Sequence, residues 1–326
     1  MLWLQFISAS AVVVYAAILL AKYGDVIAVR TRLSGVFIGT LLLAGSTSLP
    51  ELLSAINAIH VDLPDLAAGG MFGSSMFNMF VLAILDLFNQ QARILRRVAV
   101  THALTASLAN LLAGLVVFFM LAGIDAKVGW VGWDSLLIII IYIGGVRLIQ
   151  GNGPPPVQAE VDDTQTPTLK HSLLGFAAAT LVLVLITPVL VRSAAQIAAS
   201  TGLSAGFIGA TLLAFVTSLP ELVTTIAAVR LRAYDLAVGN LFGSNIFNMF
   251  ALGLTDFFFL EGRFLGAIDP AFALAGLLGL LLTGLGLIGN LARVERRLGF
   301  VELDALLILL GYLAGMYYLF TNGIGV

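Results

Sequence analysis

The sequence contains no cysteine, only three histidines and few charged residues of either sign. The missing cysteines exclude disulfide bonds, thiolate metal sites and cysteine-based catalysis. The net charge of −2 gives no sign of a nucleic-acid-binding surface, and the chain has no basic stripe. Charged residues make up 10% of the chain, whereas soluble domains carry about 25%. This composition is typical of an integral membrane protein.

Motifs for enzymatic chemistry are also missing. The 326 residues contain no Walker A loop, no H-E-x-x-H motif and no G-x-G-D-type aspartate pair. We therefore expect neither an enzyme nor an ATP-driven pump, and we expect no cofactor.

Long apolar runs dominate what is present. Hydrophobic residues make up 60% of the chain, and the mean hydropathy is +1.05. Runs of about 20 apolar residues are typical of membrane-spanning helices. Ten such runs predict an all-α integral membrane protein with ten transmembrane helices, at residues 3–21, 35–59, 66–88, 98–122, 131–149, 172–194, 205–229, 236–259, 269–291 and 302–321.

The distribution of lysine and arginine predicts the orientation of these helices. Thirteen of the sixteen fall on one side, and only Lys127, Arg192 and Arg263 fall on the other. The positive-inside rule then places both termini outside and the central linker in the cytoplasm. The compact loops favour a prokaryotic inner membrane.

The chain contains an internal duplication. When the sequence is shifted by 170 residues, segment 31–88 matches segment 201–258 without a gap, with 31 identities in 58 positions. Each copy holds five helices, and because five is odd the second copy must run in the opposite direction. This predicts two inverted five-helix repeats, an arrangement of secondary transporters. We place the first repeat at residues 1–150, a cytoplasmic linker at 151–170 and the second repeat at 171–326.

Two glutamates occupy unusual positions. Glu51 and Glu221 lie in the middle of predicted spans, whereas every other acid lies in a loop, in the linker or near a helix end. Ionisable groups at that depth are costly and usually functional. No lysine or arginine lies at the same depth, so the two acids are either protonated or neutralised by a cation from solution. Since inverted repeats bring equivalent positions together, we predict a shared cation site; neutral, hydrogen-bonded acids that hold helices together are the alternative.

The acids near helix ends receive a different interpretation. We expect interfacial water to reach them, and we interpret those that recur at the offset as interfacial caps, with gating as an alternative. The acids near helix ends are Asp86, Asp134, Asp256, Glu302 and Asp304, and those that recur are Asp86 with Asp256 and Asp134 with Asp304.

The neighbours of the two glutamates are oxygen donors. Pro50 and Pro220 lack an N–H group, which frees backbone carbonyls nearby. Calcium prefers six to eight oxygen ligands and tolerates irregular geometry. The candidate ligand side chains are Thr47, Ser48, Ser74, Asn78, Thr217, Ser218, Ser244 and Asn248. Ser74 and Ser244 could instead serve helix packing, and Asn78 and Asn248 could instead join helices by hydrogen bonds.

The paired segments STSLPE and VTSLPE, each followed by GSSMFN or GSNIFN, resemble the repeats of the cation/calcium exchanger superfamily, most closely its sodium/calcium exchanger branch. The resemblance implies sodium–calcium exchange by alternating access, with the first and sixth helices sliding against the others. It implies calcium and sodium ligands at Glu51, Glu221, Thr47, Ser48, Ser74, Thr217, Ser218 and Ser244 and at the carbonyls of Ala44 and Ala214.

The sequence departs from the pattern of some of these relatives. Some relatives carry an aspartate where this chain has Asn78 or Asn248, so the site here holds two formal negative charges. Proton-coupled relatives carry an extra glutamate close to Met71 or Leu241, and these apolar residues favour sodium. A proton-coupled or other divalent-cation exchanger remains the alternative.

The expected partners are inorganic cations and the lipid bilayer; the sequence gives no oligomeric state.

Overall fold

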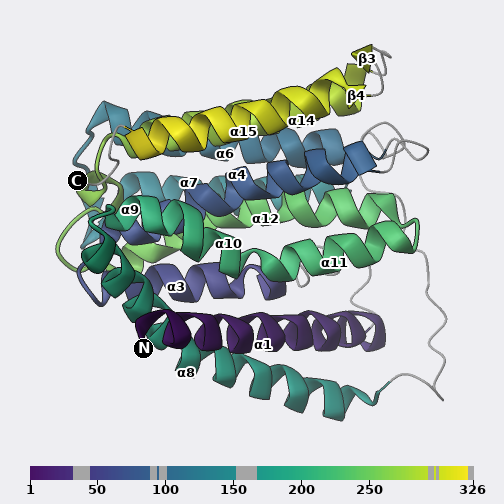
Figure 1. The fold of residues 1–326 in the computed structure, drawn as a ribbon, viewed down its shortest axis with the longest axis horizontal. Coiled ribbons are helices and arrows are strands. Elements are labelled where there is room, and N and C mark those ends of the chain that lie inside the picture. The colour runs from purple at the N-terminus through teal and green to yellow at the C-terminus, as the bar shows by residue number, and fades with distance from the viewer. Residues whose placement is uncertain are drawn as a thin grey trace.

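The structure, a computed structural model, describes residues 1–31, 45–88, 94, 101–151, 167–292, 297–298 and 301–321. Its helices run side by side as one bundle (Figure 1). The first half contains α1 (Leu2–Arg30), α3 (Leu49–Ile59), α4 (Pro64–Phe88), α6 (Thr101–Ala122) and α7 (Trp133–Gly151).

The second half repeats this order. It contains α8 (Leu169–Thr201), α9 (Ala205–Ile208), η1 (Gly209–Leu213), α10 (Ala214–Thr217), α11 (Leu219–Arg230), α12 (Tyr234–Thr255), η2 (Asp256–Phe258), α13 (Phe264–Ala267), α14 (Phe272–Ala292) and α15 (Leu303–Thr321). The predicted all-helical architecture is confirmed.

Several of these helices are suited to a bilayer. Among the described residues, α1, α4, α6, α8, α14 and α15 are each long and apolar enough to cross a membrane, and the bent pair Ala205–Thr217 and Leu219–Arg230 makes a seventh. Helix α12 is not among these helices, and it contains three asparagines, Asn240, Asn245 and Asn248. Large apolar side chains of α8, such as Leu174, Leu181 and Leu185, are exposed on the outside of the bundle, as expected for a surface that faces lipid.

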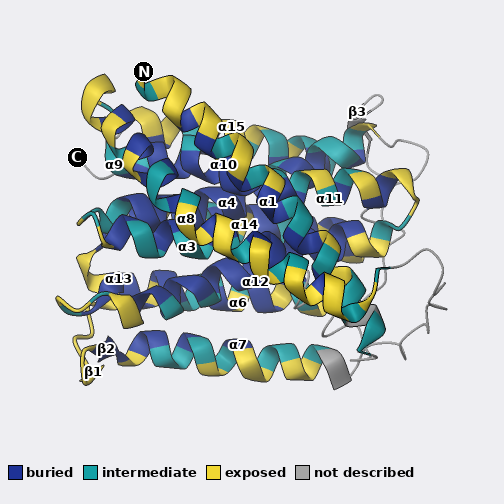
Figure 2. Ribbon diagram, turned by 90° about the horizontal axis from the view of Figure 1, so that it is seen from below, coloured by how far each residue is buried: buried dark blue, intermediate teal, exposed yellow. Residues whose placement is uncertain are grey.

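Two short hairpins show the inversion of the repeats directly. Strands β1 (Lys127–Val128) and β2 (Val131–Gly132) precede α7, and β3 (Arg297–Leu298) and β4 (Val301–Glu302) precede α15. The two hairpins occupy equivalent positions at the offset of 170 residues. They nevertheless lie at opposite ends of the bundle (Figure 2). These hairpins were not predicted from the sequence.

The bundle has two ends, which we call the terminal end and the linker end. The terminal end is where α1 begins and α15 ends, and the linker end is where α7 ends and α8 begins (Figures 1 and 2). The β1–β2 hairpin lies at the terminal end and the β3–β4 hairpin at the linker end.

Helices α4 and α12 form the centre of the bundle, and most of their residues are buried (Figure 2). Glycines let other segments approach α4 closely. A Cβ atom on Gly69 would meet the carbonyl oxygen of Gly206, and one on Gly73 would meet the backbone of Ala210. Small residues at such crossings allow close packing of membrane helices. The segment that precedes the second glutamate is thereby held against α4.

Helices α1 and α8 pack against each other along one side of the bundle (Figure 1). Gly175 of α8 leaves room for the ring of Tyr23 of α1, since a Cβ atom there would lie against that ring. These are the first and sixth helices, to which the family resemblance assigns the sliding movement.

The run predicted at residues 205–229 is not a straight helix. It bends by 43° between Thr217 and Leu219. Ser218 at the break has backbone angles of φ −89° and ψ 2°, and Ser48 in the first repeat has φ −92° and ψ 8°. In both repeats a proline follows two residues later and cannot donate the helical hydrogen bond. The equivalent proline motifs therefore produce equivalent breaks.

Candidate ion-binding site

The two glutamates lie directly after these breaks. Glu51 is in the first turn of α3, and Glu221 is in the first turn of α11. Unpaired backbone N–H groups make the first turn of a helix favourable for a negative charge. The side chains are buried, with relative exposures of 3% for Glu51 and 0% for Glu221. The S/T-S-L-P-E motif thus places a carboxylate in the interior at a helix start.

Each glutamate receives hydrogen bonds from hydroxyls of the other repeat. Ser48 of the first repeat donates to Oε1 of Glu221 at 2.8 Å. Ser218 of the second repeat donates to Oε1 of Glu51 at 3.1 Å. Thr47 also contacts the Glu221 carboxyl, and Thr217 contacts that of Glu51. The site is therefore built across the interface between the repeats.

Ser244 connects this pair to α12. Its hydroxyl lies 2.8 Å from the hydroxyl of Ser48 and donates to Oε1 of Glu221 at 3.3 Å. In the first repeat the equivalent Ser74 lies 3.5 Å from the hydroxyl of Thr217. The two repeats supply the same groups but pair them differently, because the equivalent of Ser48 is Ser218 and not Thr217.

Two asparagines complete the cluster. Asn78 donates to the hydroxyl of Ser244 at 3.1 Å, and Asn248 donates to the hydroxyl of Ser75 at 3.3 Å. Both side chains are fully buried. Because the NH₂ groups make these bonds, the amide oxygens remain available.

Four buried acceptor atoms in this cluster have no hydrogen-bond partner among the residues that the structure describes. They are Oε2 of Glu51, Oε2 of Glu221, Oδ1 of Asn78 and Oδ1 of Asn248. Buried acceptors without partners are costly and rare in folded proteins. All four are hard oxygen atoms of the kind that calcium and sodium prefer. The arrangement fits a cation.

No basic side chain among the described residues neutralises the two glutamates. Among the described residues, the basic side chains that form ion pairs are His102, Lys127 and Arg263, and none of them contacts Glu51 or Glu221. The two carboxyl groups are close enough to repel each other electrostatically. A cation between them would relieve this repulsion.

Most of the predicted ligand residues lie close together in the structure. The structure brings together the side chains of Glu51, Glu221, Thr47, Ser48, Ser74, Thr217, Ser218, Ser244 and Asn78, and Asn248 reaches the adjacent Ser75. Ala214 is buried, and its carbonyl accepts the N–H of Ser218 at 3.0 Å. Ala44 lies outside the described residues.

The sequence analysis did not assign site roles to several polar side chains that the structure places around the ligands. They are Ser75, Asn240, Asn245 and Thr283. Three of them fall within or next to the GSSMFN and GSNIFN segments, where the recurrence of the motif could have pointed to them. Thr283 lies in an apolar helix and carries no comparable signal.

The interfacial acids need a correction, because Asp86, Asp134 and Asp256 are buried rather than open to water. At the terminal end Arg263, itself buried, donates to Asp134 at 3.0 Å. Asp256 accepts the backbone N–H groups of Gly132 at 2.7 Å and Phe264 at 2.6 Å. Asp256 therefore bonds the first residue of α13 (Phe264–Ala267), and its surroundings are protein rather than interfacial water.

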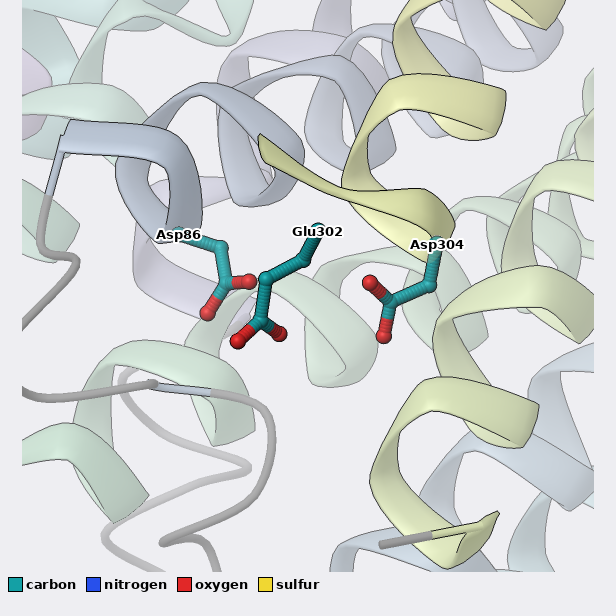
Figure 3. A group of neighbouring side chains, drawn as sticks. All are labelled: Asp86, Glu302 and Asp304. Carbon is teal, nitrogen blue, oxygen red and sulfur yellow. The ribbon is translucent and has the colours of Figure 1, made fainter. Parts of the chain in front are cut away.

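A related cluster lies at the linker end. Asp86, Glu302 and Asp304 bring carboxyl oxygens within 4.8 Å of one another (Figure 3). At the offset of 170 residues Asp86 corresponds to Asp256 and Asp304 to Asp134. The two clusters are thus repeat-related, and the counterpart of Arg263, Arg93, lies outside the described residues.

Comparison with known proteins identifies the family. The family model described as sodium/calcium exchanger protein matches residues 1–149 and 171–321. The chain belongs to the sodium/calcium exchanger family. An uncharacterized membrane protein of Methanocaldococcus jannaschii is 30% identical over 220 residues, which cover 68% of this chain and 69% of that protein. The chain is therefore a transporter-family protein and not an enzyme.

Solved exchangers share its fold. The sodium–calcium exchanger NCX_Mj matches with a TM-score of 0.62 and 24% identity, covering 98% of this chain and 100% of the other. The H⁺/Ca²⁺ exchanger CAX matches with a TM-score of 0.66 and 15% identity, covering 97% of this chain and 88% of the other. These likenesses establish the fold with its two repeat halves, which sodium-coupled and proton-coupled exchangers have in common.

Proposed function

We propose that this exchanger is a secondary antiporter that exchanges sodium for calcium by alternating access, with the ions bound between Glu51 and Glu221. The observation that carries the proposal is the set of four buried oxygen acceptors without partners around two glutamates without a basic counter-ion among the described residues. One calcium ion or two sodium ions would match the two negative charges.

The ligand set supports this proposal with residues from both repeats. It consists of Glu51, Glu221, Thr47, Ser48, Thr217, Ser218, Ser74, Ser244, Asn78 and Asn248, with the carbonyls of Ala44 and Ala214. The repeats must stay paired for the site to exist, since each glutamate is held by hydroxyls of the other repeat. The division into a repeat at 1–150, a linker at 151–170 and a repeat at 171–326 is part of the same proposal.

The same charge argument makes the exchange obligatory. An empty site with two ionised carboxylates is costly to carry between the two faces, because burial in a low dielectric penalises unpaired charge. Calcium or sodium neutralises the site and permits the switch. We place both termini outside and the linker in the cytoplasm of a prokaryotic inner membrane, in keeping with the lysine and arginine counts.

A proton-coupled exchanger is the second candidate, because CAX shares the fold. Sodium is favoured by the apolar residues Met71 and Leu241, which are buried in α4 and α12 where an additional carboxylate would serve proton exchange. Besides Glu51 and Glu221, the polar groups of the site are hydroxyls and amides, which do not titrate.

Uptake of calcium-45 into proteoliposomes tests the proposal. We expect uptake to require an outward sodium gradient and to persist with a protonophore. A pH gradient alone should drive none. Uptake driven only by the pH gradient would contradict sodium coupling.

The glutamates are tested in the same assay. Glu51→Gln and Glu221→Gln should each abolish uptake, because each removes one of the two negative charges. Glu261→Gln, which alters an exposed loop residue, is the matched control and should transport normally. Normal uptake by either site variant would contradict the proposed site.

A further inference from the structure

A polar chain leads from the ion site into α14. Asn78 donates one N–H to Ser244 at 3.1 Å and the other to Oδ1 of Asn245 at 3.0 Å. Asn245 in turn donates to the hydroxyl of Thr283 at 3.3 Å. All four side chains are buried, with relative exposures of 3% or less. This series of hydrogen-bonded side chains thus runs from the site to Thr283, a residue with no ligand role.

The donor and the acceptor of each hydrogen bond in this series of side chains are fixed. The Glu221 carboxylate only accepts, so the proton of Ser244 points toward Glu221 or Ser48 and the Ser244 oxygen accepts from Asn78. The amide of Asn78 must therefore direct its NH₂ group toward Ser244 and Asn245. Its oxygen is left without a hydrogen-bond partner among the described residues. A reversed amide would present N–H groups to a cation and would repel it.

The duplication supplies an internal comparison. At the offset of 170 residues Asn245 corresponds to Ser75, and Thr283 corresponds to Ala113. Ser75 also receives the NH₂ group of a site asparagine, Asn248, but it ends the chain on its own helix by donating to the carbonyl of Met71 at 3.1 Å. Ser75 has no further N–H or O–H group that needs an acceptor in α6, and the equivalent position in α6 is Ala113.

The difference between the repeats follows from this count of donors. An asparagine has two N–H hydrogens on its amide, and a buried one left without an acceptor is costly. The longer residue, Asn245, occurs together with a hydroxyl in α14, and the shorter residue, Ser75, occurs together with alanine in α6. Both positions differ between the repeats, and each pairing satisfies its own donors.

We propose that Asn245 and Thr283 are positioning residues that hold the Asn78 amide with its oxygen toward the ion. The inference rests on the proposed function, because it assumes that a cation occupies the site. Residues that orient metal ligands typically change metal affinity about 10- to 100-fold when they are removed. Thr283 acts at a distance, through Asn245, and does not touch the ion.

Equilibrium binding of calcium-45 to the purified full-length protein tests this role. Thr283→Val keeps the shape of the side chain and removes the acceptor, and we expect calcium binding to weaken about tenfold or more. Thr283→Ser restores the hydroxyl and should bind within about twofold of wild type. Ala113→Thr in the first repeat is the matched control, and it should leave binding unchanged because Ser75 offers no donor to it.

A paired variant separates positioning from simple packing. In an Asn245→Ser background, which copies the first repeat, Thr283→Ala should change calcium binding less than about twofold. Thermal midpoints are recorded for every variant. The inference is overturned if the Thr283→Val protein has a lower thermal midpoint but binds calcium as tightly as wild type. It is also overturned if Thr283→Ala causes the full loss of calcium affinity in the Asn245→Ser background. A wild-type protein that binds neither calcium nor sodium overturns the proposed function itself.

Discussion

Two buried acidic clusters of this exchanger have opposite electrostatic character. Glu51 and Glu221 lie between the repeats with hydroxyl partners and with two oxygens that no described residue hydrogen-bonds. Asp134 and Asp256 lie at the terminal end, where Arg263 and backbone N–H groups satisfy them. The same chemical group is thus structural where the polypeptide provides the positive partner. Where the described residues provide none, it belongs to the proposed ion site.

The largest effect on stability should come from the satisfied cluster. Arg263→Met leaves Asp134 buried without its ion pair, and breaking such a pair costs about 3–5 kcal/mol. We expect a large fall in the thermal midpoint of the detergent-solubilised protein.

The exposed pair of Lys127 with Asp125, at 3.1 Å, provides the control. Lys127→Met should cost less than about 1 kcal/mol, because solvent screens exposed pairs. Equal effects of the two variants would contradict the contrast between the clusters.

The ion site should respond in the opposite direction. Glu51→Gln removes one of two like charges and offers an N–H group to a neighbouring acceptor. We expect it to stabilise the protein by about 1–2 kcal/mol in buffer free of sodium and calcium. Added calcium should raise the thermal midpoint of wild type and not that of the variant. An ion-free variant less stable than wild type would show that the glutamate is already satisfied.

A smaller difference is expected within the site. Ser48 bonds both Glu221 and Ser244, whereas Ser218 makes one such bond, to Glu51. One additional hydrogen bond contributes about 1 kcal/mol, so Ser48→Ala should weaken calcium binding about fivefold more than Ser218→Ala. Equilibrium binding measures both, and Ser200→Ala on the exposed part of α8 is the control. Equal losses would mean that the two repeats hold the ion alike.

Sequence reasoning placed the helices well because hydropathy is a local property. The predicted run 66–88 corresponds to α4 at Pro64–Phe88, and the run 302–321 to α15 at Leu303–Thr321. It also predicted that the S/T-S-L-P-E and G-S-x-x-x-N segments come together, because the offset of 170 residues relates their two copies, and the structure places their side chains in contact. The predicted segment at 35–44 lies outside the described residues.

The errors share a different cause. The sequence analysis placed Asp134 and Asp256 in interfacial water, yet neither is exposed by more than 3%. Hydropathy alone does not reveal that an arginine 129 residues away in the chain folds back onto Asp134. The hairpins of two-residue strands are similarly too short to leave a periodic pattern.

The sequence by itself determined the membrane class, the duplication and the presence of two deeply placed glutamates, because these follow from composition and spacing along the chain. Only the tertiary structure decided that each glutamate is held by the hydroxyls of the other repeat, and that Thr283 reaches the site through Asn245. These contacts join residues of different helices. They depend on how each helix is rotated and tilted against its neighbours, which packing sets and local sequence does not.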